Sequence, residues 1–169
     1  LAVAEGAGLV AMAARFSDRE EVAVECEHVI HDCLAISDDD ERGFGAVTDA
    51  FALPKDGDAQ QARRSEAVQA ALAEAVEPPR AIVDAVDRVL GLAERVLDDA
   101  NPNVLSDVGT ALGCARAGLT AAVVTLLTNL APLRDEGLEG ELHAEIDRAD
   151  DLTERVDAQI RDVRERITR

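Results

Sequence analysis

Residues Cys26–Phe51 read CEHVIHDCLAISDDDERGFGAVTDAF and predict one long helix. Steps of alternately four and three residues put one row of side chains on a single helical face. That row consists of Cys26, Ile30, Cys33, Ser37, Asp40, Phe44, Val47 and Phe51. An unpaired carboxylate that faces a hydrophobic core is unfavourable by several kcal/mol, so Asp40 either has a partner or lines a wet cleft. We expect the cleft.

The composition predicts one all-α domain that spans residues 1–169. This length suits a single domain with a full hydrophobic core. Ala, Val and Leu dominate, Trp and Tyr are absent, and Phe occurs only three times. Small aliphatic side chains suit closely packed helices better than sheets. We therefore expect a single-domain bundle of about six helices, with one or two central buried helices.

Apolar periodicity and turn residues set the expected helix boundaries. Leu1–Phe16 is apolar on almost all sides, which predicts a central position. Val104–Leu130 carries an aliphatic row and a second row of small residues, which would allow another helix to approach closely. The remaining expected helices are the long one, capped by Ser17 and ended by Leu53-Pro54, then Ala59–Val76, a fourth from Pro78-Pro79 to about Asp99, and an amphipathic one after Gly137 and Gly140 that could pack on this bundle or on a partner.

The charge balance excludes some partners. A net charge of −18 argues against duplex nucleic acid, because phosphate backbones are bound by clustered lysine and arginine. The apolar opening Leu1–Ala14 contains Glu5 and no basic leader, so it predicts neither a signal peptide nor a membrane span. The three cysteines and three histidines show no disulfide framework and no metal-ligand spacing. We expect a cytoplasmic protein with reduced cysteines and without a metal site.

The acidic run Asp38-Asp39-Asp40 is the first candidate for chemistry. On a continuous helix, Asp38 could form an exposed ion pair with Arg42 four residues later, whereas Asp40 points with the apolar row. The alternative is that Ser37 caps a new helix and that the acids stabilise its N-terminus. The residues by themselves leave both interpretations open.

Other polar residues could bind a substrate. Lys55, Arg63 and Arg64 concentrate positive charge around one turn, which could hold an anionic tail or be ordinary surface charge. In the segment Asn101–Asp107, Asn103 or Ser106 could cap the fifth helix, or free N–H groups there could bind an anion. Asn129 is a polar residue in an aliphatic run. No Ser/His/Asp or Cys/His arrangement can be assembled with any specificity.

At these residues the sequence resembles the formiminotetrahydrofolate cyclodeaminase/methenyltetrahydrofolate cyclohydrolase family, which includes the cyclodeaminase domain of the bifunctional formiminotransferase-cyclodeaminase. The resemblance covers Asp38 to Leu130, and each of its pieces is weak alone but specific in combination. The family's Gly-rich loop ahead of the first helix is not present in this chain. The shared pieces are Asp38-Asp-Asp40, Phe44, Leu53-Pro54-Lys55, Arg63-Arg64, Val68-Gln69, Leu72, Pro79, Asn101-Pro-Asn-Val-Leu-Ser-Asp107 and Asn129-Leu130.

The resemblance implies an all-α homodimer that performs one-carbon chemistry on a reduced folate. It implies that Asp40 is the catalytic acid/base, and our hypothesis is that Asp38 tunes or orients it. Neither a metal nor a coenzyme beyond the tetrahydrofolate substrate is implied. The substrate contacts expected from it are Asn103, Ser106, Asp107 and Asn129 around the pterin, and Lys55 and Arg64 on the glutamate tail, which can be polyglutamylated.

The expected reaction is cyclodeamination of 5-formiminotetrahydrofolate to 5,10-methenyltetrahydrofolate and ammonia. The alternative is methenyltetrahydrofolate cyclohydrolase activity, which forms 10-formyltetrahydrofolate. Both reactions need one group that takes and returns a proton, and one carboxyl group can do this. A further alternative from a different class is a non-catalytic helical module that serves dimerisation.

Overall fold

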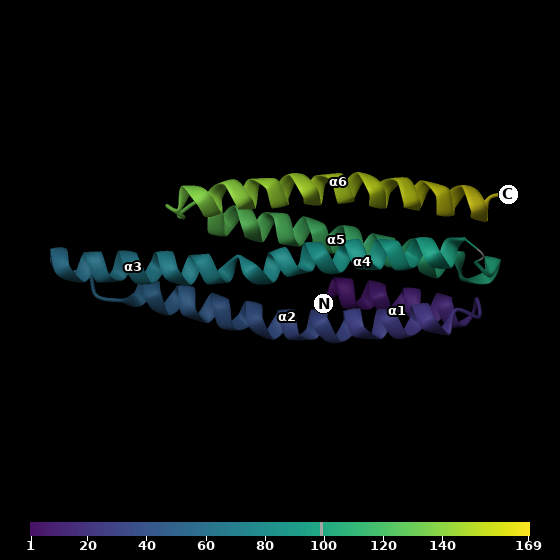
Figure 1. Cartoon of the computed structure of the whole chain (residues 1–169), viewed down its shortest axis with the longest axis horizontal. Coiled ribbons are helices and arrows are strands. Elements are labelled where there is room, and N and C mark those ends of the chain that lie inside the picture. The colour runs from purple at the N-terminus through teal and green to yellow at the C-terminus, as the bar shows by residue number, and fades with distance from the viewer. Residues whose placement is uncertain (99) are drawn as a thin grey trace.

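The computed structural model describes residues 1–98 and 100–169, and all regular structure within them is helical (Figure 1). The all-α prediction is therefore confirmed, and most expected boundaries agree with the observed ones to within a few residues. The expected start of the last helix after Gly140 is wrong, because Asp135 caps that helix and both Gly137 and Gly140 lie within it. The expected end of the fourth helix at about Asp99 lies outside the described residues. The elements are α1 (Ala2–Arg15), α2 (Glu20–Ala52), α3 (Asp58–Ala75), α4 (Glu77–Leu97), the 3₁₀ turn η1 (Pro102–Val104), α5 (Leu105–Leu130) and α6 (Glu136–Ile167).

Helix α2 runs without a break through the acidic segment, so the alternative in which Ser37 caps a new helix is wrong. The expected cap at the start of α2 is also wrong, because Arg19 and not Ser17 occupies the N-cap position. The Ser17 hydroxyl instead accepts a hydrogen bond of 3.1 Å from the backbone N–H of Asn101. That bond ties the α1–α2 turn to the connection between α4 and α5.

Helices α3 and α4 follow one another along nearly the same line, as Figure 1 shows. Val76 between them keeps helical backbone angles, with φ −85° and ψ −16°. Pro78 and Pro79 lie in the first turn of α4, where a missing N–H removes no intrahelical hydrogen bond. The proline pair therefore divides the two helices without turning the chain, and α3 extends beyond the main bundle alongside the end of α2.

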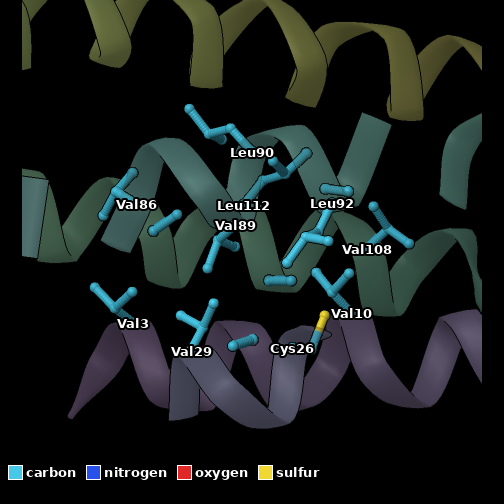
Figure 2. Packing of buried hydrophobic residues seen from close by; sticks show 14 of the residues in the cluster. Val3, Val10, Cys26, Val29, Val86, Val89, Leu90, Leu92, Val108 and Leu112 are labelled. Atoms are coloured by element: carbon cyan, nitrogen blue, oxygen red, sulfur yellow. The ribbon is translucent and has the colours of Figure 1, made fainter. Parts of the chain in front are cut away.

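The main core lies where α1 packs against α2, α4 and α5 (Figure 2). The small-residue row of α5 faces α1, which confirms the expected close approach. A Cβ atom added at Gly6 would lie 2.9 Å from the carbonyl oxygen of Ala111, and one at Gly118 would collide with Val3. Helices α1 and α5 can approach this closely only because these two positions lack side chains.

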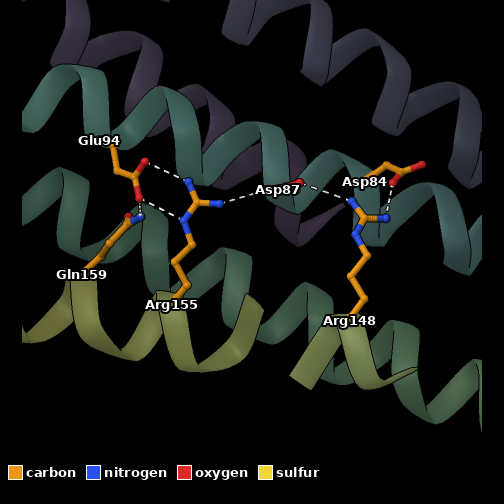
Figure 3. A network of polar contacts seen from close by, with 6 residues as sticks. All are labelled: Asp84, Asp87, Glu94, Arg148, Arg155 and Gln159. Carbon is orange, nitrogen blue, oxygen red and sulfur yellow. Dashed lines mark hydrogen bonds and ion pairs between the residues drawn. The ribbon is translucent and has the colours of Figure 1, made fainter. Parts of the chain in front are cut away.

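Helix α6 packs on its own bundle and is fastened to α4 by a row of charged side chains (Figure 3). Arg155 contacts Asp87 and Glu94, each at 2.8 Å. Arg148 contacts Asp84 at 2.5 Å and Asp87 at 3.3 Å. The sequence left open whether this helix packs on a partner, and the structure assigns its apolar face to the bundle.

By length and composition, the 29-residue segment Pro102–Leu130 could cross a membrane, and no other segment in the described part of the chain could. Helix α5, which makes up most of it, packs against α1, α4 and α6. Leu112, Leu119 and Leu126 on it are almost completely buried. The apolar character of α5 is therefore that of a core helix.

Candidate active site

Asp40 lies on α2 where two hollows meet beside α5. The inner hollow has a volume of about 210 Å³ and lies between the first residues of α1, the middle of α2, the start of α4 and α5. The middle hollow has a volume of about 350 Å³ and lies between α2, α3 and α5. Asp40 and Thr125 line both hollows. The expectation that Asp40 lines a cleft is confirmed.

The lining of these two hollows differs in character. Around the inner hollow, the side chains from α5 are small, namely Ala117, Gly118, Ala121, Ala122 and Thr125. The middle hollow is walled by larger apolar side chains and a few polar ones, namely Phe44, Val47, Phe51, Leu72, Ala75, Thr128, Asn129 and Pro132. Asp40 is the one carboxylate side chain among the described residues that line either hollow.

An outer hollow of about 470 Å³ adjoins the middle one, with which it shares Phe51 and Pro132. The inner, middle and outer hollows together are called the groove below. Lys55, Arg64 and Arg134 line the outer hollow, and none of them pairs with a carboxylate in the described part of the chain. This concentration of unpaired cations stands out in a chain with a net charge of −18.

Arg64 is held in place by Phe51. Its Nε donates a hydrogen bond of 3.1 Å to the carbonyl oxygen of Phe51, and its guanidinium lies 5.4 Å from the centre of the Phe51 ring. Bound in this way, the guanidinium keeps its other N–H groups for a ligand. Phe51 thus forms a wall of the groove and also orients a cation at its outer end.

Cys33 lines the inner hollow and is a second group there that could act chemically. Its burial raises the pKa of the thiol above the ordinary value. A thiol with a raised pKa stays protonated at neutral pH, and the thiolate is the nucleophilic form. Cys33 is therefore a poor candidate for a nucleophile in this hollow.

Comparison with known proteins identifies the family. A model of the formiminotransferase-cyclodeaminase family matches residues 1–148. A methenyltetrahydrofolate cyclohydrolase of Methylorubrum extorquens is 33% identical over 155 residues, which cover 85% of this chain and 74% of that protein. The chain belongs to the formiminotransferase-cyclodeaminase family.

Two further proteins share part of the sequence or the fold. The formimidoyltransferase-cyclodeaminase of Mus musculus is 28% identical over 112 residues, which are 66% of this chain but only 21% of that longer protein. The crystal structure of formiminotetrahydrofolate cyclodeaminase from Thermotoga maritima superposes with a TM-score of 0.80 at 19% identity. It covers 96% of this chain and 84% of that one, which shows that the fold is shared.

The family's Asp-x-Asp element is divided between the groove and the solvent. Both aspartates are exposed in the single chain, but Asp40 lines the inner and middle hollows, whereas Asp38 lines none of the three. The expected ion pair between Asp38 and Arg42 is wrong, because Arg42 pairs with Asp39 three residues before it. The tuning role hypothesised for Asp38 stays a prediction.

Asn103, Ser106 and Asp107 do not join Asp40 within one chain. They lie in η1 and the first turn of α5, at the opposite end of that helix from Asn129. Since a helix rises about 1.5 Å per residue, Ser106 and Asn129 are roughly 35 Å apart along α5. Contact between the first three residues and a ligand in the groove would require a second copy of the chain.

Of the other expected substrate contacts, Lys55, Arg64 and Asn129 are brought together along the groove. Asn129 lines the middle hollow, and its amide Nδ2 donates a hydrogen bond of 3.0 Å to the carbonyl oxygen of Ala75. This bond connects α5 to the last residue of α3. Asn129 therefore has a structural role in addition to the ligand contact that stays a prediction.

Sequence reasoning missed Arg134, Gln69 and Pro132 as groove residues. Arg134 hydrogen-bonds to Ser65, 69 positions away in the sequence, so no local pattern could place it. The row on α2 did contain a signal for the aromatic walls. Phe44 is 74% exposed and Phe51 45% exposed, because their part of the row faces the groove and not the core.

Proposed function

We propose that this protein is a folate one-carbon enzyme that hydrolyses 5,10-methenyltetrahydrofolate to 10-formyltetrahydrofolate, with Asp40 as the acid/base. A folate substrate is implied by membership of the family. The observation that carries the proposal is the position of Asp40 between the inner and middle hollows. The reacting carbon of the substrate bridges N5 and N10, which lie between the pterin and the aminobenzoyl group.

The order of the hollows supports this orientation of the substrate. The inner hollow, with its small side chains, would hold the flat pterin. The middle hollow would hold the aminobenzoyl ring against Phe44 and Phe51. The outer hollow would place the glutamate carboxylates beside Lys55 and Arg64, where charge-assisted hydrogen bonds are strong. In this arrangement the one-carbon bridge lies beside Asp40.

The hydrolysis uses a single carboxyl group twice. The Asp40 carboxylate takes a proton from water as the oxygen bonds to the methenyl carbon, and the cationic substrate becomes a neutral carbinol. The carbon–N5 bond then breaks, Asp40 returns the proton to N5, and the hydroxyl proton of the carbinol is released to solvent. One water is consumed and one proton is produced. The negative charge of Asp40 also favours the cationic substrate.

Cyclodeamination, the reaction placed first by the sequence, becomes the second candidate. The relative named as a cyclohydrolase aligns with this chain at higher identity and over more of both chains than the mouse cyclodeaminase does. The same groove would serve the second reaction. N10 would attack the carbon of the protonated formimino group and lose its proton to Asp40, and Asp40 would return that proton to the resulting amino nitrogen, which leaves as ammonia and gives the methenyl cation.

The remaining expectations are part of the proposal. We infer a cytoplasmic homodimer that needs no coenzyme beyond its folate substrate. A second copy would offer a route by which Asn103, Ser106 and Asp107 reach a groove. The further alternative, a non-catalytic dimerisation module, disagrees with membership of an enzyme family.

The test is a pair of assays with the wild-type protein. Hydrolysis predicts loss of the methenyl absorbance when enzyme is added to 5,10-methenyltetrahydrofolate, at a rate above the uncatalysed one. Cyclodeamination predicts ammonia release from 5-formiminotetrahydrofolate. Catalysis of the first reaction alone supports the proposal, and catalysis of the second alone replaces it with the second candidate. Failure to turn over either substrate would refute both.

A further inference from the structure

The connection between α5 and α6 has little secondary structure of its own, yet it forms a wall of the groove. Pro132 in this connection lines both the middle and the outer hollow, and Arg134 lines the outer one. A connection of this kind keeps a defined shape only if other parts of the chain bind its backbone groups. Its attachment therefore decides whether Arg134 stays at the groove.

Gln69 on α3 provides that attachment through both ends of its side-chain amide. Its Nε2 donates a hydrogen bond of 2.9 Å to the carbonyl oxygen of Pro132. Its Oε1 accepts a hydrogen bond of 2.8 Å from the backbone N–H of Arg134. Two bonds from one amide fix the position and the orientation of the connection.

The guanidinium of Arg134 is directed to the same wall. Its Nη1 donates a hydrogen bond of 3.0 Å to the hydroxyl of Ser65, one residue after Arg64 on α3. Ser65 is a neutral acceptor, so the positive charge of Arg134 is not neutralised by this contact. In contrast, Arg148 and Arg155 lie on α6 where it contacts α4, and each is paired with two or more carboxylates.

Three cations that have no carboxylate partner among the described residues thus face one hollow from three segments of the chain. Lys55 comes from the α2–α3 turn, Arg64 from α3 and Arg134 from the α5–α6 connection. The three positive charges repel one another, which is unfavourable in the absence of a ligand. They lie together without an acidic partner in the described chain even though the sequence contains 35 acidic residues. An arrangement that gathers like charges in a hollow is favourable when an anion binds there.

We propose that Arg134 is a further substrate-binding residue, which contacts a carboxylate of the folate tail, and that Gln69 is the positioning residue that holds it there. This inference rests on the proposed function, because it assigns the outer hollow to the tail of the same substrate. A glutamate tail carries two carboxylates. Arg134 adds a third cation, on a further segment of the chain, that can contact one of these carboxylates while Lys55 and Arg64 contact the other.

The experiment compares 5,10-methenyltetrahydrofolate with 5,10-methenyltetrahydropteroate, which lacks the glutamate. For Arg134→Gln we expect the KM of the folate to rise about tenfold, as for the loss of one charge-assisted hydrogen bond. The KM of the pteroate and both kcat values should stay within twofold of wild type. Arg134→Lys should restore part of the preference for the glutamate-bearing substrate, since it restores the charge.

The matched control is Arg164→Gln, which removes the same charge from an exposed arginine near the far end of α6. It should leave both KM values unchanged. Gln69→Leu should reduce the preference for the glutamate-bearing substrate. Adding Arg134→Gln to it should cause little further loss, because both changes remove the same contact between Arg134 and the glutamate tail. Equal effects of Arg134→Gln on folate and pteroate, or no effect on either, would overturn the proposal.

A separate readout distinguishes this inference from the proposed function. If the wild-type protein turns over neither substrate, the equilibrium affinities of tetrahydrofolate and tetrahydropteroate take the place of the KM values. A wild-type preference for tetrahydrofolate that Arg134→Gln abolishes would support the tail site without any activity. The absence of such a preference in the wild type would overturn it.

Discussion

In the half of the bundle that contains α1, the start of α2 and most of α4, most aliphatic side chains are buried and the arginines on α4 and the facing part of α6 are paired. Leu90 and Leu112 are completely buried there, and Arg155 binds two carboxylates of α4. Around the end of α2 and the end of α5, some large apolar side chains are exposed and arginines lack carboxylate partners in the described chain. Phe44 and Leu127 are 74% and 47% exposed, and Arg64 and Arg134 have no carboxylate partner in the described chain.

This difference separates the residues that hold the fold from those available to a ligand. The closed half, as the first region is called here, satisfies most of its apolar and charged groups internally. In the open half, which is the second region, exposed apolar side chains and arginines without carboxylate partners line the groove. There they contribute little to the stability of the fold. Groups that a protein leaves unsatisfied are those that a bound molecule can satisfy. The two halves should therefore respond oppositely to mutation, in stability and in substrate binding.

The largest effect on stability is expected from Leu112→Ala in the closed half. Leu112 is 0% exposed, and its truncation should lower the free energy of unfolding by about 2–5 kcal/mol through lost burial and a residual cavity. Leu127→Ala removes the same atoms from an exposed position on the same helix and should change it by about 0.5 kcal/mol or less. Urea unfolding followed by circular dichroism measures both. Equal losses would erase the proposed contrast.

A smaller effect is expected from Glu94→Gln at the α4–α6 contact. The hydrogen bond from Arg155 lowers the pKa of Glu94 in the folded protein. The ionised group therefore stabilises the fold above its unfolded pKa of about 4.3, and this contribution is lost as pH falls through the lower folded value. Because Glu94 is 47% exposed, solvent screening limits the effect at pH 7 to about 0.5–1 kcal/mol.

Unfolding curves at pH 7 and below pH 4 give the readout for that variant. The difference between wild type and Glu94→Gln should shrink as the solution becomes more acidic. Glu66→Gln, at an exposed glutamate of α3 for which the described chain shows no ion pair, is the control. A Glu94→Gln deficit that persisted undiminished in acid would show that packing and not charge accounts for it.

Phe44→Ala should have the smallest effect on stability and a visible effect on binding. Its side chain lines the middle hollow beside Asp40 and is mostly exposed. We expect the free energy of unfolding to change by less than about 0.5 kcal/mol, while the KM for 5,10-methenyltetrahydrofolate rises about fivefold through lost aromatic contact. Steady-state kinetics and urea unfolding of one preparation test both statements. An unchanged KM would remove Phe44 from the substrate site.

Most of the fold was predictable because it follows from local periodicity. Three local patterns predicted their structure from residues within one or two helical turns. They are the row on α2, the small-residue row on α5 and the proline pair in the first turn of α4. Burial was harder to predict. The spacing that places Phe44 in line with Cys33 gives the face of a helix, but not the point along it at which the neighbouring helices stop covering that face.

The candidate site was predictable only in part. The break in apolar character at Asp40 indicated a cleft, and the family resemblance implied a function for it. The segment Asn101–Asp107 belongs to the same family pattern, but the long straight course of α5 carries it away from Asp40. The hydrogen bond between Gln69 and Arg134 joins segments more than sixty residues apart in the sequence, and only the fold brings them together.

The most direct test of the account is the turnover of Asp40→Asn beside that of Asp39→Asn. The two residues are adjacent on α2, but Asp39 pairs with Arg42 and lines none of the three hollows of the groove. For an acid/base at the reacting carbon, we predict that Asp40→Asn lowers kcat/KM for 5,10-methenyltetrahydrofolate at least about 100-fold, with Asp39→Asn within about threefold of wild type. Turnover of both folate substrates by Asp40→Asn within about threefold of wild type would contradict the account.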